Sequence, residues 1–123
     1  MLSIRLLRKS FGHAIDGLVL ALEENQNLRI HFFVAVVIMI ASIALQISRF
    51  EMGILGIMIL LVISTEMLNT SVEKMVDLIT NEHRKEAKFA KDVAAGMVLI
   101  NAVGSVIVGS VIFIPHIISL FHH

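Results

Sequence analysis

The sequence has 123 residues, of which 57% are hydrophobic and 16% are charged, and its formal net charge at pH 7 is zero. This length fits one domain and excludes two. A soluble domain has about a quarter of its residues charged, so the composition favours a membrane protein. The absence of cysteine excludes disulfides, thiolate metal sites and cysteine nucleophiles. Because the charge is balanced and no basic tract stands out, no nucleic-acid partner is expected.

The first predicted element is an amphipathic helix within residues 1–28. Its apolar side chains recur every three or four positions, at Ile4, Leu7, Phe11, Ala14, Leu18 and Leu22. Arg5, Arg8 and Lys9 lie mostly off this stripe. The pattern is typical of a helix that lies in the membrane interface, with its cations near lipid phosphates. It is equally compatible with an ordinary helix packed on a bundle.

Three apolar runs follow, and we expect helices that contain membrane spans at 30–48, 52–79 and 91–121. Phe32–Ser48 has no charged residue and would form roughly 26 Å of helix, close to the thickness of a bilayer core. The last run contains Pro115 near its far end. The buried core of a soluble bundle is disfavoured, because too little charged surface remains to cover three such helices. The predicted fold is one all-α integral membrane domain over residues 1–123, with an interfacial helix and three transmembrane helices.

The cations predict the orientation of these helices. With the N-terminus and the connection after the second span in the cytoplasm, the cytoplasmic side holds Arg5, Arg8, Lys9, Arg29, Lys74, Arg84, Lys85, Lys88 and Lys91. Only Arg49 is then outside. The positive-inside rule therefore predicts a multi-pass protein with its N-terminus and any active site at the cytoplasmic face.

An acidic stripe continues from the second apolar run. Glu66, Asn69, Glu73 and Asp77 fall on one helical face, over about 16 Å at 1.5 Å per residue. Their carboxylates would repel one another unless a cation is bound, either a metal ion or the Lys and Arg residues of the next segment. Glu66 follows a mostly apolar stretch, so we expect it below the membrane surface, where it is a candidate proton acceptor.

Two other polar segments supply candidate partners for this stripe. Lys91 and Asp92 stand where the third span begins, and Lys91 can bind a ligand or simply pair with Glu73 or Asp77. Glu24, near the end of the first helix, belongs either to a polar turn or to a metal site, and oxygen ligands of this kind suit Mg²⁺. No glycine-rich phosphate motif is present, so a nucleotide would be held by side chains and metal.

Longer motifs add a resemblance to a known family. The stretch "EMLNTSVEKMVDLI", followed by "AKFAKDVAAGMVLI", resembles the signature of the prokaryotic diacylglycerol kinase family, which are small integral-membrane lipid kinases. The likeness covers nearly the whole chain, including "SFGHAIDGL" and "NLRIH". It looks closer to the Gram-positive branch, whose members include undecaprenol kinases, than to the proteobacterial diacylglycerol kinases.

The resemblance implies a homotrimer in the cell membrane, with active sites shared between protomers. It implies transfer of the ATP γ-phosphate, with Mg²⁺ as cofactor, to a membrane lipid alcohol at the cytoplasmic interface. Undecaprenol is the preferred acceptor and diacylglycerol the alternative. A non-enzymatic channel or scaffold is a more remote reading of the same residues, because polar groups are scarce in the outer halves of the spans.

Carried over by position, the resemblance also assigns roles to residues. Glu66 is the general base that takes the proton of the lipid hydroxyl, and Asn69 supports Glu66 and the transferring phosphate. Glu73 is a Mg²⁺ ligand that also contacts the nucleotide. The further residues of the ATP site are His13, Glu24, Asp77, Glu82, His83, Arg84, Lys91 and Asp92.

Two positions depart from the family pattern. The second metal-binding glutamate of the family falls on Asn25, with Glu24 one residue earlier. Either a local shift lets Glu24 reach the metal, which we predict, or that ligand is weakened. Arg84 stands where a histidine is usual, and its guanidinium suits phosphate.

Overall fold

The computed structural model describes residues 3–122, which contain four α-helices: α1 Ile4–Glu24, α2 Gln26–Ala44, α3 Arg49–Ile79 and α4 Lys85–Leu120. The predicted all-α class is confirmed. The last three helices are long and apolar enough to cross a membrane. α3 and α4 contain 31 and 36 residues, which give lengths of about 46 and 54 Å. Both therefore exceed a hydrocarbon core of about 30 Å and extend beyond it.

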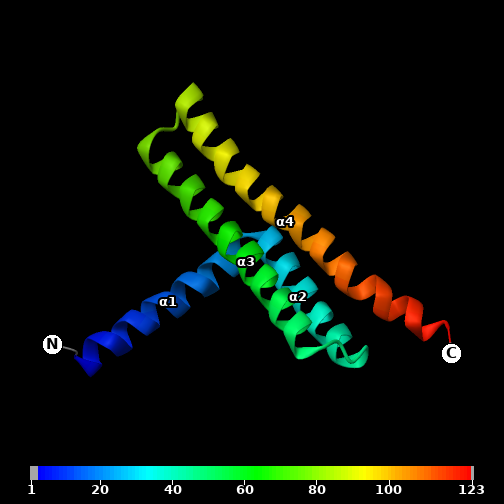
Figure 1. The fold of residues 1–123 in the computed structure, drawn as a ribbon. Helices are drawn as coiled ribbons and strands as arrows, with labels where there is room; N and C mark the ends of the chain where they lie inside the picture. The colour runs from blue at the N-terminus through cyan, green and yellow to red at the C-terminus, as the bar shows by residue number, and fades with distance from the viewer. Residues whose placement is uncertain (1–2, 123) are drawn as a thin grey trace.

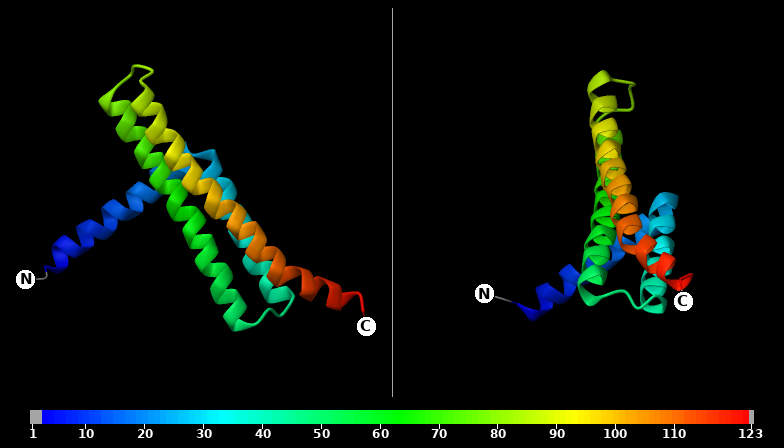
Figure 2. Two further views of the ribbon diagram at one scale, coloured as in Figure 1. Left: turned by 45° about the horizontal axis from the view of Figure 1, so that its top comes forward. Right: turned by 45° about the vertical axis from the view of Figure 1, so that its right-hand side comes forward.

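The helices form a bundle from which α1 departs (Figure 1). α3 and α4 are antiparallel and form a long hairpin with the most extensive interhelical contact, while α2 packs against α3 and α1 contacts α2. The other views show α1 leaving the bundle at a steep angle near the middle of α3 (Figure 2). Because α2 is shorter than α3, the closed end of the hairpin extends beyond the start of α2.

The corner between α1 and α2 is made by one residue outside the helices. The Asn25 side chain accepts a hydrogen bond from the Leu28 amide at 3.2 Å and so caps α2. The Arg29 guanidinium donates to the carbonyls of Leu22 and Glu23, both at 2.8 Å. These bonds satisfy carbonyl groups in the last turn of α1 that have no partner within the helix. The first helix consequently ends at Glu24, whereas the sequence analysis extended it to residue 28.

The other boundaries also differ from the expected ranges for local reasons. α2 ends at Ala44, and Gln46 adopts a left-handed conformation with φ 54° in the turn that follows. The Ser48 hydroxyl accepts from the Glu51 amide at 3.1 Å and donates to Glu51 Oε1 at 2.9 Å, which caps α3 and makes it begin at Arg49. Only 80–84 separates α3 from α4, which begins at Lys85 and keeps Pro115 inside it.

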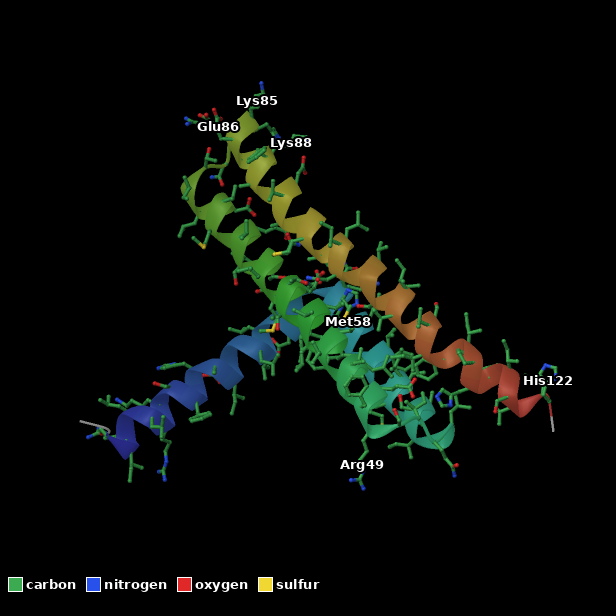
Figure 3. All side chains as sticks on the ribbon, in the orientation of Figure 1. Arg49, Met58, Lys85, Glu86, Lys88 and His122 are labelled. Carbon is green, nitrogen blue, oxygen red and sulfur yellow. The ribbon has the colours of Figure 1, made fainter. Side chains whose placement is uncertain are left out.

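Little apolar surface is buried within a single chain. Ile47, Leu55 and Ile112 form the buried hydrophobic cluster. Only 6% of the most apolar window of α4 is buried, and many large aliphatic side chains of the three apolar helices are exposed. Surfaces of this extent have to be covered by lipid or by other protein chains. Figure 3 shows Arg49 at one end of the hairpin and Lys85 and Lys88 at the other.

Candidate active site

The deepest carboxylate of the molecule is held where the α1–α2 corner meets α3. The Asn25 amide donates to Glu66 Oε1 at 2.9 Å and to Thr70 Oγ1 at 2.6 Å. The Thr70 hydroxyl donates in turn to the Glu66 carbonyl at 3.0 Å. Glu66 is only 3% exposed, so protein groups surround its carboxylate. A buried carboxylate needs such a partner, and Asn25, 41 positions earlier in the chain, supplies it here.

The second oxygen of this carboxylate faces α2. His31 Nε2 lies 3.9 Å from Glu66 Oε2, and the His31 side chain is 25% exposed. This distance is too long for a direct hydrogen bond. The two oxygens of Glu66 therefore differ: Oε1 is fixed by Asn25, and Oε2 remains close to an imidazole without being bound to it.

The acidic stripe lines one pocket at this corner. The corner pocket has a volume of about 590 Å³, and its walls are Glu24, Asn25, Gln26, Asn27, Glu66, Asn69, Thr70, Glu73, Lys74 and Asp77. The four residues predicted to share a helical face all line it. Glu66 and Asn69 are buried, whereas Glu73 and Asp77 are exposed. Burial by protein therefore decreases along α3 from Glu66 towards Asp77.

Two residues of the corner pocket present oxygen atoms suited to a divalent cation. The buried Oδ1 atom of Asn69 has no hydrogen-bond partner within residues 3–122, and the Asn69 amide lies 3.5 Å from Glu73 Oε1. No cluster of three or more His, Asp or Glu side chains that could hold a metal occurs in the described part of the chain. Mg²⁺ needs no such cage, since it is usually bound by one or two carboxylates together with substrate phosphates. The residues present fit that mode.

Glu24 lies in the same pocket with a different partner. Its Oε2 atom is 2.9 Å from Lys74 Nζ, and the two side chains are 51% and 68% exposed. An exposed ion pair contributes little to stability, so Glu24 can exchange Lys74 for another cation at small cost. Asn25, where the family pattern has a glutamate, is already engaged with Glu66.

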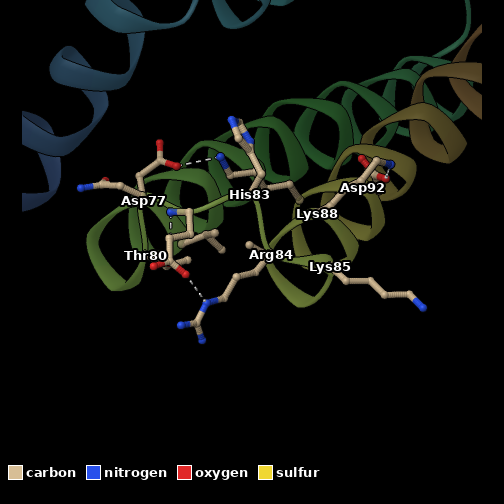
Figure 4. A pocket seen from close by; sticks show the side chains of 12 residues that line it. Asp77, Thr80, His83, Arg84, Lys85, Lys88 and Asp92 are labelled. Atoms are coloured by element: carbon tan, nitrogen blue, oxygen red, sulfur yellow. Dashed lines mark hydrogen bonds and ion pairs between the residues drawn. The ribbon is translucent and has the colours of Figure 1, made fainter.

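A second polar pocket lies at the closed end of the α3–α4 hairpin (Figure 4). This hairpin-end pocket has a volume of about 700 Å³ and is lined by Val76, Asp77, Thr80, Asn81, Glu82, His83, Arg84, Lys85, Ala87, Lys88, Lys91 and Asp92. Lys91 Nζ donates to Asp77 Oδ1 at 2.7 Å, so the pairing of Lys91 with Asp77 is the one formed. Asp77 lines both pockets, which therefore adjoin.

Four of the other charged groups of the hairpin-end pocket also form ion pairs. Arg84 pairs with Glu82 at 3.1 Å, and Lys88 pairs with Asp92 one turn further along α4. All four side chains are more than half exposed. The pocket contains four cationic side chains, from Arg84, Lys85, Lys88 and Lys91, against the acids Asp77, Glu82 and Asp92. A polyanion can displace these exposed pairs, because each is weak by itself.

The structure gathers most of the predicted site residues and leaves one apart. His13 lies on an exposed part of α1 and lines neither polar pocket. The sequence analysis in turn assigned no role to His31 or Thr70 and treated Asn25 only as a departure from a pattern. His31 lies in the stretch "NLRIH" and Thr70 in "LNT", but contacts between α2 and α3 cannot be predicted from the spacing of residues along one helix.

Comparison with known proteins gives consistent matches. The family model described as prokaryotic diacylglycerol kinase matches residues 12–113. A Bacillus subtilis protein named undecaprenol kinase is 40% identical over 107 residues, which cover 87% of this chain and 87% of the relative. A Synechocystis protein named diacylglycerol kinase is 38% identical over 112 residues, which cover 90% of this chain and 64% of the relative. The match thus spans slightly less than two thirds of the Synechocystis protein.

Proposed function

Because the chain belongs to the prokaryotic diacylglycerol kinase family, we propose that it transfers the γ-phosphate of ATP to the hydroxyl group of a membrane lipid alcohol. The observation that carries this proposal is the position of Glu66. Its buried carboxylate lies where the apolar part of α3 gives way to the acidic stripe. A lipid hydroxyl resides at that depth, because its hydrocarbon chain stays in the bilayer while its polar end reaches the interface.

The chemistry follows from this placement. The hydroxyl oxygen of the lipid forms a bond to the γ-phosphorus, the bond from that phosphorus to the bridging oxygen of ADP breaks, and the hydroxyl proton passes to Glu66 Oε2. Asn25 holds Oε1 at 2.9 Å, so it leaves the other oxygen free to accept the proton. Phosphoryl transfer depends on positioning and charge neutralisation rather than on covalent catalysis, and polar side chains held on packed helices serve that purpose.

Mg²⁺ is the cation that this donor set suits. Glu73 would hold it together with the Oδ1 atom of Asn69, which has no hydrogen-bond partner within residues 3–122, and Glu24 would contribute after releasing Lys74. When bound with ATP, the ion neutralises the charge of the phosphates. If Glu24 is the second ligand, Glu24→Ala should raise the Mg²⁺ concentration that gives half-maximal activity. An unchanged Mg²⁺ requirement would exclude Glu24 from this role.

The nucleotide itself is assigned to the hairpin-end pocket. Its four cations suit a polyphosphate, and its junction with the corner pocket at Asp77 would direct the γ-phosphate towards Glu66. This assignment gives Glu82, His83, Arg84, Lys91 and Asp92 their nucleotide-binding roles. It also requires the closed end of the hairpin to be cytoplasmic, which agrees with the segregation of Lys85 and Lys88 from Arg49 (Figure 3).

A homotrimer in the cell membrane, with α1 along the cytoplasmic interface, completes the proposal. It is supported by the large apolar surface that a single chain leaves exposed. It is also supported by the separation of His13 from the remaining nucleotide-binding residues, since a neighbouring copy can supply a residue that one chain holds apart. α1 has no buried residue, as expected of a helix that lies on a lipid surface.

The acceptor we propose is undecaprenol, with diacylglycerol as the alternative. The relative named undecaprenol kinase is matched over 87% of both chains, whereas the relative named diacylglycerol kinase is matched over 64% of its own length. The test is a kinase assay of the purified protein with radiolabelled MgATP and both lipids in parallel. Labelled undecaprenyl phosphate is the expected main product. No labelled lipid from either acceptor would refute the proposed activity.

A further inference from the structure

An apolar pocket lies directly beyond the Glu66 site, inside the part of the bundle that spans the membrane. It has a volume of about 170 Å³ and is enclosed by α2, α3 and α4. Its walls are almost entirely aliphatic and include the buried side chains of Leu55, Val62 and Ile63. His31 and Ser105 are the polar residues that line it. The Ser105 hydroxyl donates to the Asn101 carbonyl of its own helix at 2.7 Å, so His31 provides the available polar group.

His31 therefore connects the apolar pocket with the catalytic carboxylate. Its Nε2 atom lies 3.9 Å from Glu66 Oε2, and two polar atoms at this separation can be joined by one oxygen between them. An oxygen about 2.8 Å from each satisfies normal hydrogen-bond geometry. A hydroxyl group at this point would donate to Glu66 Oε2. It would accept from His31 in the tautomer that carries its proton on Nε2.

We propose that this pocket receives the beginning of the acceptor's hydrocarbon chain and that His31 hydrogen-bonds the acceptor hydroxyl. This inference rests on the proposed function. His31 lines this pocket and lies 3.9 Å from Glu66 Oε2, so an alcohol bound here has its oxygen at the base and its chain among aliphatic side chains. The rest of a long chain extends into the bilayer.

This arrangement selects a chemical class of alcohol. In a polyprenol, hydrocarbon begins at the carbon that bears the hydroxyl. In a diacylglycerol, two ester groups lie within three carbons of the hydroxyl. Their carbonyls would enter a pocket whose two polar residues are already engaged, Ser105 by the Asn101 carbonyl and His31 by the acceptor hydroxyl. Burying a carbonyl without a hydrogen bond is unfavourable. The pocket is thus matched to a polyprenol and mismatched to a diacylglycerol.

The role of His31 is tested by a pair of substitutions. His31→Leu removes the donor, and His31→Gln keeps an N–H group at a similar position. Because one hydrogen bond to the acceptor is lost, kcat/KM for undecaprenol should fall about 10- to 100-fold in His31→Leu. His31→Gln should recover most of that loss, and KM for MgATP should stay within about twofold of wild type in both. A role limited to packing would make the two variants equally impaired, and that outcome would overturn the assignment.

The pocket is tested by filling it. Gly109 lines the pocket, and a Cβ added there meets no heavy atom within 4 Å, so Gly109→Leu can place its side chain in the cavity. Gly53→Leu is the matched control, since Gly53 is equally open but does not line the pocket. KM for undecaprenol should rise at least about fivefold in Gly109→Leu and stay near wild type in Gly53→Leu, with the same elution volume for all three proteins.

The outcomes separate this inference from the activity on which it rests. A wild-type protein that phosphorylates neither lipid refutes the proposed function. An active wild type whose KM for undecaprenol is unaffected by Gly109→Leu refutes the pocket assignment alone. Preference of the active wild type for diacylglycerol also contradicts the pocket assignment and leaves the kinase activity in place.

Discussion

The corner pocket and the hairpin-end pocket adjoin at Asp77 but are built in different ways. In the corner pocket, Asn25 comes from the α1–α2 corner and fixes a buried carboxylate on α3 through a hydrogen bond of 2.9 Å, and it also donates to Thr70 at 2.6 Å. In the hairpin-end pocket, exposed ion pairs between neighbouring parts of one hairpin hold the side chains. The first site is preorganised by long-range packing, whereas the second can rearrange around a ligand. This difference supports the proposal that the chemical step takes place in the corner pocket and that the hairpin end captures the nucleotide.

The largest expected effect comes from removing the base of the corner pocket. Glu66→Gln retains the size of the side chain and an oxygen for the Asn25 amide but cannot take a proton. Turnover with undecaprenol should fall about 10³-fold, within the usual range for general-base catalysis. Glu51→Gln is a control in the first turn of α3, outside both polar pockets, and should keep nearly full activity. Wild-type turnover in Glu66→Gln would exclude Glu66 as the general base.

A smaller loss is expected from changing the residue that holds the base. Asn25→Asp keeps an oxygen that caps α2 through the Leu28 amide. It replaces the donor to Glu66 by a second carboxylate, which repels the first. We expect kcat to fall about 10- to 100-fold while the helix content measured by circular dichroism is unchanged. Asn27→Asp, two residues away on the same pocket wall, adds the same charge without removing that donor. Equal activities of the two variants would show that added charge alone matters.

At the hairpin end the expected effect falls on affinity for the nucleotide. Lys91→Met removes the cation that lies 2.7 Å from Asp77 and keeps much of the aliphatic length. KM for MgATP should rise about tenfold, whereas kcat at saturating ATP should change less than threefold. Steady-state kinetics over a range of ATP concentrations measures both. A fall in kcat with an unchanged KM would place Lys91 in the chemical step instead, and the division between the two pockets would be wrong.

A substitution remote from both pockets should change the stability of the protein without changing its kinetics. Gln46 occupies a left-handed conformation with φ 54°, which costs free energy for a residue with a side chain. Gln46→Gly should raise the stability by about 0.5–1 kcal/mol, after allowance for the extra flexibility of glycine in the unfolded chain. The thermal midpoint in detergent should rise slightly, with unchanged kinetics. A lower midpoint would mean that the Gln46 side chain contributes contacts that outweigh the backbone strain.

The sequence was sufficient for the features that depend on periodicity. The helical spacing of Glu66, Asn69, Glu73 and Asp77 placed them on one face, and the apolar run before Glu66 predicted its burial. Hydropathy alone identified the three long apolar helices. These features lie within single helices, where position along the chain determines position in space.

The features that the sequence did not reveal depend on contacts between helices. The Asn25 bond to Glu66 arises because a one-residue corner turns α2 against the middle of α3, and neither helix encodes that crossing point by itself. The approach of His31 to Glu66 depends on the same packing. The predicted helix ends also differ from the observed ones. Side-chain caps such as Ser48 and Asn25 define a helix end to within a residue, whereas hydropathy changes gradually along the chain.

The central claim is that the corner pocket carries the chemical step and the hairpin-end pocket binds the nucleotide. It is tested most directly by nucleotide binding to Glu66→Gln. The measurement is the Kd for MgATP of wild type and Glu66→Gln, determined by isothermal titration calorimetry in detergent without lipid. We predict values within about twofold of each other, although turnover differs by about 10³-fold. A Kd raised in proportion to the loss of turnover would contradict the account, because Glu66 would then bind the nucleotide rather than act on the lipid hydroxyl.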